Sequence, residues 1–389
     1  MEDQDNTKIK KNILITGGGT GGHLYPAMAV IEYLQEKYHG SSLTFIGSEK
    51  GMGHKLIPAM GIDFYKVKAR GLTISRSALK KFSGYAGFIF ALIPGFIMAL
   101  KILKRKKITE ILGMGGYVCA PVFLAAMVRK IDFSIHEQNY IPGRLNKLFS
   151  PKAKYVFISF KETKKYLRAK EGSVVFSGNP VRRAVREFRR SVPSYGKWGL
   201  DKDRFTIIAF GGSLGAEKIN NTIAGLYGEF ARDSRIQILL ISGDRYYADI
   251  SRIVESKIKR DDNLIFRVKA YIDQMDQIYS IADLIIARAG ANTVFETAAT
   301  GIPSIFIPYP DAIEDHQFYN AKYIADMGKA VLLRENKLSV RTLSDIIKNL
   351  LKNGMERYLK MRSVSIPNSG EESLKIITGK LMEDNIGTR

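Results

Sequence analysis

Short apolar runs bounded by turn residues alternate with longer amphipathic stretches along most of the chain. Such a short run predicts a buried strand, and apolar positions three or four residues apart predict a helix. The alternation of the two indicates parallel sheets covered by helices on both faces. In the first half we expect a helix at 26–39 and strands at 12–16, 43–46, 64–67, 110–112, 133–136, 155–158 and 174–176.

The second half repeats this pattern after a polar and basic segment, 182–202, which we interpret as a linker. A chain of 389 residues exceeds what one core usually supports, so two domains are expected. The tail after Ser363 is expected to form a helix. The other elements predicted in this half are strands at 206–210, 236–241, 264–268, 284–286, 304–307 and 330–333, and helices at 219–232, 247–258, 293–300 and 316–327.

A glycine-rich turn follows the first strand of each half, at residues 17–22 in the first and 211–216 in the second. Glycine lets backbone amides approach an anion closely, and the N-terminus of the following helix carries partial positive charge. Two such turns at the heads of similar half-chains predict twin doubly wound, Rossmann-like domains with a ligand held between them.

The first turn fits the G-x-G-x-x-G pattern of dinucleotide-binding proteins at Gly17, Gly19 and Gly22. That function also needs an acidic residue at the end of the second strand to hold the ribose hydroxyls. Here the strand ends in Gly47 and Ser48, so the pattern is incomplete. No lysine follows either turn as it does in a P-loop, which disfavours a P-loop nucleotidase.

The charge balance points to an anionic partner. The sequence has 60 basic and 38 acidic residues, a formal net charge of +22. An excess of this size fits nucleic acid, anionic lipid or a phosphorylated substrate. The single cysteine, Cys119, rules out an intramolecular disulfide and fits a reducing compartment. The N-terminal residues are acidic and polar, unlike a signal peptide, so we expect a cytosolic protein.

Residues 82–100 carry no charge, and only basic charges flank them between Lys80 and Lys107. A membrane-spanning helix, a buried core helix and a helix-loop-helix lying in the membrane interface all remain open. We favour the third, because glycines and Pro94 interrupt the run, with apolar side chains in lipid and lysines on phosphate headgroups. The expected membrane patch is Phe82, Phe88, Phe90, Ile93, Phe96 and Ile97.

An ordered set of motifs across residues 13–320 resembles the MurG family of peptidoglycan N-acetylglucosaminyltransferases. Single motifs of this kind recur among nucleotide-sugar enzymes, whereas the full ordered set is specific. The motifs are GGTGGH at 18–23, GMGGYV at 113–118, HEQN at 136–139, GNPVR at 178–182, GGSLGA at 211–216, RAGANTVFE at 288–296, and DHQ at 315–317 followed by Asn320.

The resemblance implies a GT-B fold, in which two doubly wound domains face each other across a cleft. It implies an N-terminal acceptor-binding and membrane-associating domain at 1–180, a UDP-GlcNAc-binding domain at 181–366, and a final helix at 367–389 that returns to the N-terminal domain. The implied reaction is inverting transfer of GlcNAc from UDP-GlcNAc to the C4 hydroxyl of lipid I, the undecaprenyl-diphosphate-linked MurNAc-pentapeptide. The product is lipid II, a precursor of peptidoglycan.

The implied location is the cytoplasmic face of the plasma membrane, as a peripheral protein. The implied partners are UDP-GlcNAc, lipid I, an anionic membrane surface and other proteins of cell-wall synthesis. No nucleic-acid partner is expected, because the basic run flanks aliphatic residues rather than aromatic stacking platforms.

The reaction needs a base near the attacking hydroxyl and positive potential near the departing diphosphate. His23, at the mouth of the first glycine turn, is the candidate base, because a neutral imidazole can accept a proton. It is also open that His23 only orients the turn, and Glu137 is the alternative acid–base group. The amides of Thr20, Gly21 and Gly22 are expected to bind substrate, at the diphosphate of the acceptor.

On the donor side, Ser213 and Arg182 suit the UDP phosphates. Glu296 matches the family position that accepts hydrogen bonds from the ribose hydroxyls, and the backbone of Ile272 matches the position that binds uracil. Asn139, Gln317 and Asn320 suit sugar hydroxyls. The turn and helix of the same motif complete the set with Ala291, Asn292, Thr293, Val294 and Phe295.

No Cys/His cluster has the spacing of metal ligands, so no obligatory cofactor or metal is expected. Three other functions remain to be weighed. A UDP-sugar epimerase on the same fold would share the donor half but would not need the membrane patch. A nucleic-acid-binding protein would use the positive charge. A glycolipid synthase with another sugar or lipid would differ only in its acceptor contacts.

Overall fold

The computed structural model describes residues 10–49, 51–67, 78–187, 192–212, 214–352 and 366–383, with the backbone alone at 78–91 and 192–193. The chain divides into two compact units. The first comprises Met1–Arg182 together with Asn368–Arg389, and the second comprises Arg183–Pro367. We describe each unit by itself.

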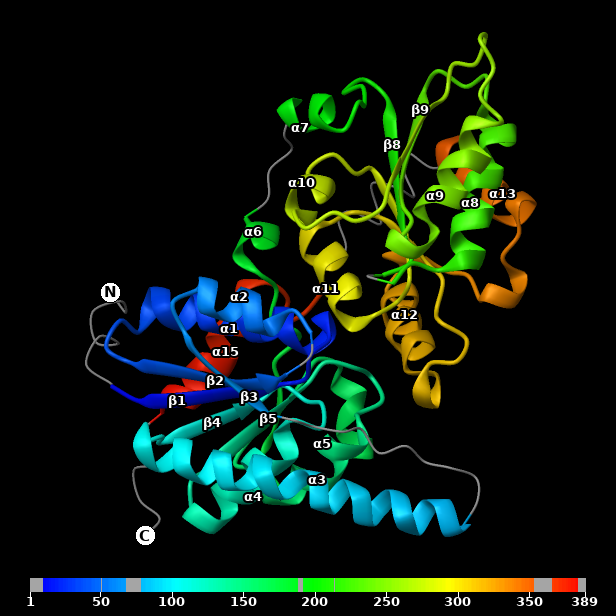
Figure 1. The fold of residues 1–389 in the computed structure, drawn as a ribbon. Coiled ribbons are helices and arrows are strands. Elements are labelled where there is room, and N and C mark those ends of the chain that lie inside the picture. The colour runs from blue at the N-terminus through cyan, green and yellow to red at the C-terminus, as the bar shows by residue number, and fades with distance from the viewer. Residues whose placement is uncertain are drawn as a thin grey trace. The chain divides into compact units, whose positions relative to one another are not determined.

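The described part of the first unit contains a seven-stranded parallel sheet in the order β3-β2-β1-β4-β5-β6-β7 (Figure 1). The chain reverses direction across the sheet between β1 and β4, so this is the switch point where ligands bind in such sheets. The strands are β1 Asn12–Gly17, β2 Ser42–Ser48, β3 Asp63–Val67, β4 Glu110–Gly113, β5 Phe133–Glu137, β6 Val156–Ile158 and β7 Val174–Phe176.

Alternating side chains of β1 build two cores on opposite faces of this sheet. Ile13 and Ile15 pack with α1 and α15, and Leu14 packs with α3 and α4 on the other face. The helices are α1 Gly21–Lys37, α2 Gly53–Ala59, α3 Ala78–Arg105, α4 Cys119–Arg129, α5 Arg144–Phe149 and α15 Glu371–Met382, with short 3₁₀ helices η1 Ser150–Lys152 and η2 Lys161–Tyr166.

Helix α1 begins at Gly21, five residues before the predicted start at residue 26. Thr20 is the N-cap residue, with extended backbone angles, and its carbonyl accepts from the amides of His23 and Leu24, each at 3.2 Å. Pro26 lies inside the helix rather than at its start. His23 therefore belongs to the first turn of a helix and not to a loop.

The expectation of a helix-loop-helix over residues 82–100 is wrong, because α3 is one continuous helix that includes Pro94. Gly95 serves packing here and does not break the helix. A Cβ at this position would lie 2.9 Å from Val67 and 3.3 Å from Pro121 of α4, so its absence lets α3 approach both. Among the described residues, no helix combines the length and the apolarity needed to cross a membrane.

The expected membrane patch is only partly visible on α3. Ile93 and Ile97 are exposed, whereas Phe96 is partly buried against the core. The side chains of Phe82, Phe88 and Phe90 lie outside the described residues.

The C-terminal helix α15 packs on α1 in the first unit (Figure 1, red beside dark blue). Its side chains Leu374, Ile377 and Leu381 are fully buried in the core that contains Ile13 and Ile15. The chain enters this helix through a bridge between Pro180 and Gly370, and the side-chain amide of Asn368 donates to the carbonyl of Phe176 at 2.7 Å. The first unit is thus built from both ends of the sequence.

A buried carboxylate at the N-terminal end of β4, in the seven-stranded sheet, makes the stability of the first unit depend on pH. Glu110 at the start of β4 is 2% exposed and lies 3.4 Å from the Lys154 ammonium and 4.0 Å from that of Lys11. Burial outweighs both lysines and raises the pKa of Glu110 from 4.5 to about 7. The folded state therefore binds more protons than the unfolded state between these values, and the stability from Glu110 is lost as pH rises through this window, by at most about 3 kcal/mol.

Replacing Glu110 by glutamine is expected to reduce this loss of stability between pH 5 and pH 8. Urea unfolding of the wild type and the variant at both pH values measures the effect. Glu372→Gln, at an exposed acid in the first turn of α15, is the control and should keep the wild-type dependence. An unchanged pH dependence in Glu110→Gln would contradict the assignment.

The described part of the second unit contains a six-stranded parallel sheet in the order β10-β9-β8-β11-β12-β13. Ile207 and Ala209 of β8 pack with α8 and α13 on one face. The strands are β8 Phe205–Phe210, β9 Ile236–Ile241, β10 Ile265–Lys269, β11 Leu284–Ala287, β12 Ser304–Phe306 and β13 Ala330–Leu332.

The segment 182–202, predicted as a linker, contains two short helices, α6 Arg183–Arg186 and α7 Val192–Lys197. Val185 of α6 is buried, and α6 packs on α10 and α11, so tertiary packing holds α6 in place in spite of its polar composition. The other helices in the described part of the second unit are α8 Glu217–Phe230, α9 Asp244–Glu255, α10 Met275–Tyr279, α11 Ala291–Thr300, α12 His316–Asp326 and α13 Val340–Lys352, with 3₁₀ helices η3 Ile313–Asp315 and η4 Glu335–Lys337.

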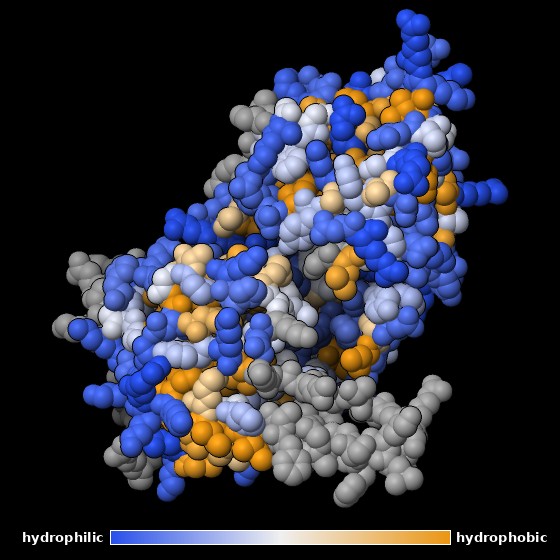
Figure 2. All heavy atoms as spheres, in the orientation of Figure 1, coloured by the Kyte–Doolittle hydropathy of each residue, from blue (hydrophilic) through white to orange (hydrophobic). Residues whose placement is uncertain are grey.

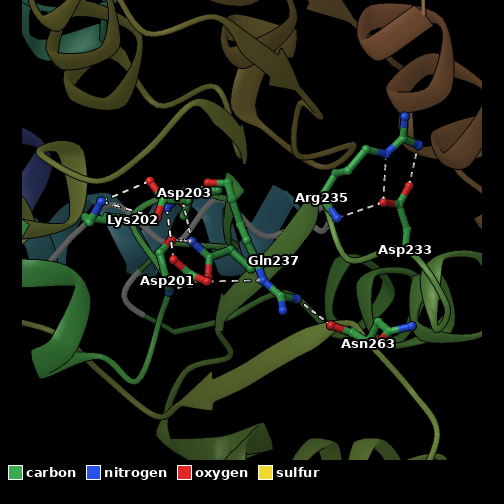
Figure 3. Close-up of polar contacts among 9 residues, drawn as sticks. Asp201, Lys202, Asp203, Asp233, Arg235, Gln237 and Asn263 are labelled. Atoms are coloured by element: carbon green, nitrogen blue, oxygen red, sulfur yellow. Dashed lines mark hydrogen bonds and ion pairs between the residues drawn. The ribbon is translucent and has the colours of Figure 1, made fainter.

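Polar contacts close the N-terminal edge of the second sheet (Figure 3). Gln237 at the start of β9 is fully buried. Its amide donates to the Asp201 carbonyl at 2.6 Å and to the Thr206 hydroxyl at 2.8 Å, and it accepts from the Asp201 amide at 2.8 Å. Beside it, the Arg235 guanidinium forms a bidentate pair with Asp233. The glycine turn lies at the other edge of this sheet, where the strands end.

Candidate active site

In the first unit, the turns after β1 and β4 pack backbone against backbone at the carboxyl edge of the sheet. The Gly18 amide donates to the Gly115 carbonyl at 2.8 Å. Gly116 has a φ of +84°, and a Cβ there would lie 2.9 Å from the Gly18 Cα. Only glycine fits this crossing without strain. Because no side chains separate the two turns, their backbone forms a flat surface on which the His23 ring lies.

His23 is held against this floor by a hydrogen bond. Its ring contacts Gly18 and Gly115, where a Cβ would lie 3.1 Å and 3.0 Å from ring carbons. Nδ1 of His23 lies 3.1 Å from Oε1 of Gln138. The side chain is half-buried, so the imidazole sits at the surface of the switch point and not within the core.

Gln138 and His136 extend this contact into the interior. Nε2 of Gln138 lies 2.8 Å from the Met114 carbonyl and 3.0 Å from Nδ1 of His136. Nε2 of His136 lies 3.1 Å from the Gly178 carbonyl. Burial lowers the pKa of His136 to about 4, so this imidazole is neutral near pH 7.

Glu137, the alternative acid–base group, is buried and accepts hydrogen bonds with both oxygens. Oε1 accepts from the Asn139 amide at 2.9 Å. Oε2 accepts from the Gly143 amide at 2.9 Å and from the Asn146 side chain at 2.7 Å. This arrangement anchors the loop after β5, which carries Asn139, and gives Glu137 a structural role.

The predicted anion-binding amides lie at the start of α1. Gly21 and Gly22 are its first two residues, where helix amides point toward the N-terminal end. Thr20 and Gly22 are exposed. Arg182 also belongs to the first unit, and its guanidinium lies over the Tyr25 ring, 4.1 Å from the centroid. Tyr25 had no role in the sequence interpretation.

In the second unit, a cavity of about 1360 Å³ opens at the second glycine turn. This volume exceeds the ~300–1,000 Å³ of typical ligand pockets. Of the predicted substrate residues, Thr293 and Gln317 line it. The turn contributes Gly211, Gly212, Leu214, Gly215 and Ala216, while Ser213 lies outside the described residues.

The cavity also collects charged residues that sequence reasoning missed. Lys218 and Arg245 line it, and so does Arg288, which forms a largely buried ion pair with Glu335. Arg288 also donates to the carbonyls of Ile307 and Pro308 at 3.2 and 3.0 Å. Arg288 therefore fixes the loop after β12. Lys218 and Arg245 place cations on the cavity wall, each beside an acid that also lines it, Glu217 and Asp244. No spacing along the sequence links these positions.

The remaining predicted donor residues gather around α11. Ala291, Asn292 and Thr293 form its first turn, whereas the side chains of Val294 and Phe295 are fully buried in the core. Glu296 is buried and accepts from the Tyr279 hydroxyl at 2.8 Å. The first turn of α11 contains no acid, so Glu296 is not an ordinary acid of a helix N-terminus.

Three further predicted residues serve the loops around the cavity. Asn320 is fully buried and donates to the Ala289 carbonyl at 3.2 Å, just before α11. Gln317 accepts from the Tyr309 amide at 3.0 Å. Ile272 is buried between β10 and α10. Asn320 thus shapes the turn that precedes α11, while Gln317 also reaches the cavity.

Across the described residues, no group of three or more His, Cys, Asp or Glu side chains gathers as a metal site would. The expectation that no metal is obligatory stays a prediction. Cys119 is fully buried, and burial raises the pKa of its thiol to about 12, so it remains protonated.

Comparison with known proteins bears on both units. Two family models match the chain, the glycosyltransferase family 28 N-terminal domain over residues 13–158 and the C-terminal domain over residues 206–375. The UDP-N-acetylglucosamine--N-acetylmuramyl-(pentapeptide) pyrophosphoryl-undecaprenol N-acetylglucosamine transferase of Natranaerobius thermophilus is 35% identical over 371 residues, which is 94% of this chain and 98% of that protein. The protein of the same name from Halothermothrix orenii is 33% identical over 96% of this chain and 98% of its own length.

Solved structures agree with this relationship. MurG of Acinetobacter baumannii is similar with a TM-score of 0.70 and 28% identity, covering 95% of this chain and 99% of that one. The UDP-GlcNAc 2-epimerase of Neisseria meningitidis has a TM-score of 0.67 at 15% identity, covering 97% and 100%, and shares the fold alone. The chain therefore belongs to the MurG family of hexosyltransferases, within glycosyltransferase family 28, and has the GT-B fold.

Proposed function

We propose that this chain transfers GlcNAc from UDP-GlcNAc to the C4 hydroxyl of lipid I, with inversion at the anomeric carbon, to give lipid II for peptidoglycan synthesis. The observation that carries the proposal is the 35% identity over 94% of the chain to a relative named for this transfer. The two glycine turns with their attached sites fit a reaction between two phosphorylated substrates.

In this proposal the first unit supplies the base. The C4 oxygen attacks the anomeric carbon while His23 takes the hydroxyl proton on Nε2, and the bond from that carbon to the UDP oxygen breaks. The exposed start of α1, with Thr20, Gly21 and Gly22, binds the acceptor diphosphate. Glu137 takes no part in proton transfer, because its oxygens hold the loop after β5.

The second unit binds the donor and receives the charge of the departing UDP. The start of α11 and the cationic side chains Lys218 and Arg245 stabilise the diphosphate. Glu296 accepts from the ribose hydroxyls and the Ile272 backbone binds uracil. Ser213 and Arg182 contact phosphates, and Asn139 and Gln317 contact sugar hydroxyls. These groups neutralise the leaving group without an obligatory metal or other cofactor.

The test is transfer of radiolabelled GlcNAc from UDP-GlcNAc to lipid I, run with and without EDTA. Labelled lipid II in both arms is the expected result. Ceramide and diacylglycerol acceptors are the controls for a related glycolipid synthase. Release of UDP or a modified free sugar, without lipid II, would contradict the proposal and favour an epimerase.

We further propose that the first unit binds the cytoplasmic face of the plasma membrane through an α3–α4 apolar face, made of Ile93, Ile97, Leu124, Met127 and Val128. All five side chains are exposed. Figure 2 shows apolar side chains gathered over α3 and α4. Exposed cations flank the face at the ends of the two helices, namely Lys101, Lys104, Arg105, Arg129 and Lys130. Apolar insertion with a basic flank supplies two signals for stable peripheral binding to anionic lipid.

Replacing Val128, which is 65% exposed, by aspartate is expected to weaken binding to vesicles that contain phosphatidylglycerol by about 10-fold. Co-sedimentation with such vesicles measures the change. Ile258→Asp is the matched control, because Ile258 is 51% exposed in the second unit. Equal binding of Val128→Asp and the wild type would rule out this face.

A further inference from the structure

His23, Gln138 and His136 form a row of hydrogen bonds. Only one assignment of donors and acceptors along this row satisfies every atom. The Met114 carbonyl can only accept, so the Gln138 side-chain atom 2.8 Å away is the NH₂ group. Reversing the amide would bring two oxygens together. The Gln138 oxygen therefore faces Nδ1 of His23 at 3.1 Å, and Nδ1 must carry the hydrogen.

The hydrogen bonds of Gln138 and His136 in the interior require the same assignment of donors and acceptors. The second hydrogen of the Gln138 NH₂ group faces Nδ1 of His136 at 3.0 Å and the His136 carbonyl at 3.3 Å. Both must accept, so Nδ1 of His136 carries a lone pair and no hydrogen. Nε2 of His136 carries the hydrogen and donates to the Gly178 carbonyl at 3.1 Å. The assignment therefore starts from two backbone carbonyls, those of Met114 and Gly178, and a carbonyl can only accept a hydrogen bond.

The far carbonyl is itself held in place. Gly178 has a φ of +72°, and a Cβ there would lie 1.7 Å from the Asn368 carbonyl oxygen. Its carbonyl also accepts from the Ser177 hydroxyl at 3.0 Å. Gln138 and His136 are both buried, so water does not compete for these contacts.

We infer that Gln138 and His136 are positioning residues that hold His23 in the neutral tautomer with hydrogen on Nδ1 and the lone pair on Nε2. The inference deepens the proposed function and rests on it, since Nε2 is the atom that takes the C4 hydroxyl proton there. The tautomer of a histidine is set by the hydrogen bond of its other ring nitrogen.

The hydrogen bonds through Gln138 and His136 orient His23, but they do not conduct the proton. In the reaction the O4–H bond breaks and an Nε2–H bond forms, so His23 becomes an imidazolium. The Gln138 oxygen keeps accepting from Nδ1, and an amide does not take a proton from it. The proton therefore leaves His23 from Nε2, the nitrogen that received it.

Nitrogen NMR of the full chain labelled with ¹⁵N-histidine tests the inference without relying on activity. At pH 8.5 a free imidazole is neutral, so the two tautomers are distinguished by which nitrogen carries the hydrogen. The chain has five histidines, and His23→Gln identifies the signals of His23. We expect hydrogen on Nδ1 of His23 and on Nε2 of His136. Hydrogen on Nε2 of His23 in the wild type would overturn the inference.

Gln138→Leu removes the positioning contacts. We expect its His23 to lose the Nδ1–H tautomer, and kcat for transfer to fall about 100-fold with an unchanged KM for UDP-GlcNAc. Gln237→Leu is the matched control, because it also deletes a fully buried amide that is hydrogen-bonded. Gln237 lies in the second unit, at the N-terminal edge of its sheet and away from the glycine turn (Figure 3). It should keep the tautomer and kcat.

Two outcomes separate this inference from the proposed function. A Gln138→Leu protein that keeps both the tautomer and kcat would overturn the positioning role. A wild type with the Nδ1–H tautomer that makes no lipid II would overturn the proposed function and leave the assigned tautomer standing.

Discussion

Replacement of His23 by alanine is expected to lower kcat for lipid II formation by about 10²–10⁴-fold, the range for loss of a general base. The KM for UDP-GlcNAc should change little, because the cavity at the second glycine turn is lined by residues of the second unit. Steady-state transfer from radiolabelled UDP-GlcNAc to lipid I measures both constants.

A second substitution separates proton transfer from packing. His23→Gln keeps a hydrogen-bond donor for Gln138 and much of the volume over Gly18 and Gly115, but it has no basic nitrogen. It should lose as much kcat as His23→Ala. His39→Ala, at an exposed histidine just beyond α1, is the control and should match the wild type. Near-normal turnover in His23→Gln would end the assignment of His23 as the base.

Gly215→Ala is expected to destabilise the second unit by about 2–4 kcal/mol and to weaken UDP-GlcNAc binding at least 10-fold. Gly215 has a φ of +74°, and a Cβ there would lie 2.1 Å from the Ser242 carbonyl oxygen and 2.9 Å from the Tyr246 ring. Ser242 directly follows β9, whereas Tyr246 lies in the first turn of α9 and lines the cavity with Gly215. The methyl group must therefore displace one wall of the cavity.

The same substitution elsewhere in the unit supplies the control. Gly228 lies in α8, is exposed, and has nothing within 4 Å of the position of a Cβ. Gly228→Ala should be neutral or stabilise by about 0.5–1 kcal/mol, because alanine favours a helix interior. Thermal unfolding and isothermal titration with UDP-GlcNAc measure the two effects. Equal binding by Gly215→Ala and Gly228→Ala would show that the turn does not shape the donor site.

Features that local sequence dictates were predictable. The buried strands appear as apolar runs, and β7 and β9 have the expected bounds, Val174–Phe176 and Ile236–Ile241. The alternation of strands and helices predicted the two parallel sheets, and the family motifs predicted the GT-B fold. His23 could be proposed as a site residue because it follows a glycine turn, and a glycine turn is recognisable within a few residues.

Features that depend on tertiary contacts were not predictable from local patterns. Pro94 and Gly95 indicated a break in α3, yet packing against Val67 and Pro121 keeps one continuous helix. Helix α4 also presents apolar side chains to solvent, which the α3 sequence alone could not reveal.

The candidate site shows the same limit. Gln138 meets His23 across 115 positions of the chain, so only the fold reveals the contact. Arg245 and Lys218 reach the cavity from different helices, with no common motif. Asn320 was expected at a sugar hydroxyl because its type suits one, but it is buried and bonded to Ala289. A residue type predicts which bonds a side chain can make and not where the fold places it.

The return of α15 to the first unit ties the completion of that unit to the synthesis of the second unit. Leu374, Ile377 and Leu381 fill the core beside Ile13 and Ile15, yet they leave the ribosome after the whole second unit. Until then the nascent chain exposes the apolar groove between α1 and the sheet, a surface that chaperones bind. Every chain cut short before residue 371 lacks that helix, so the core that contains Ile13 and Ile15 stays incomplete until the second unit has been made.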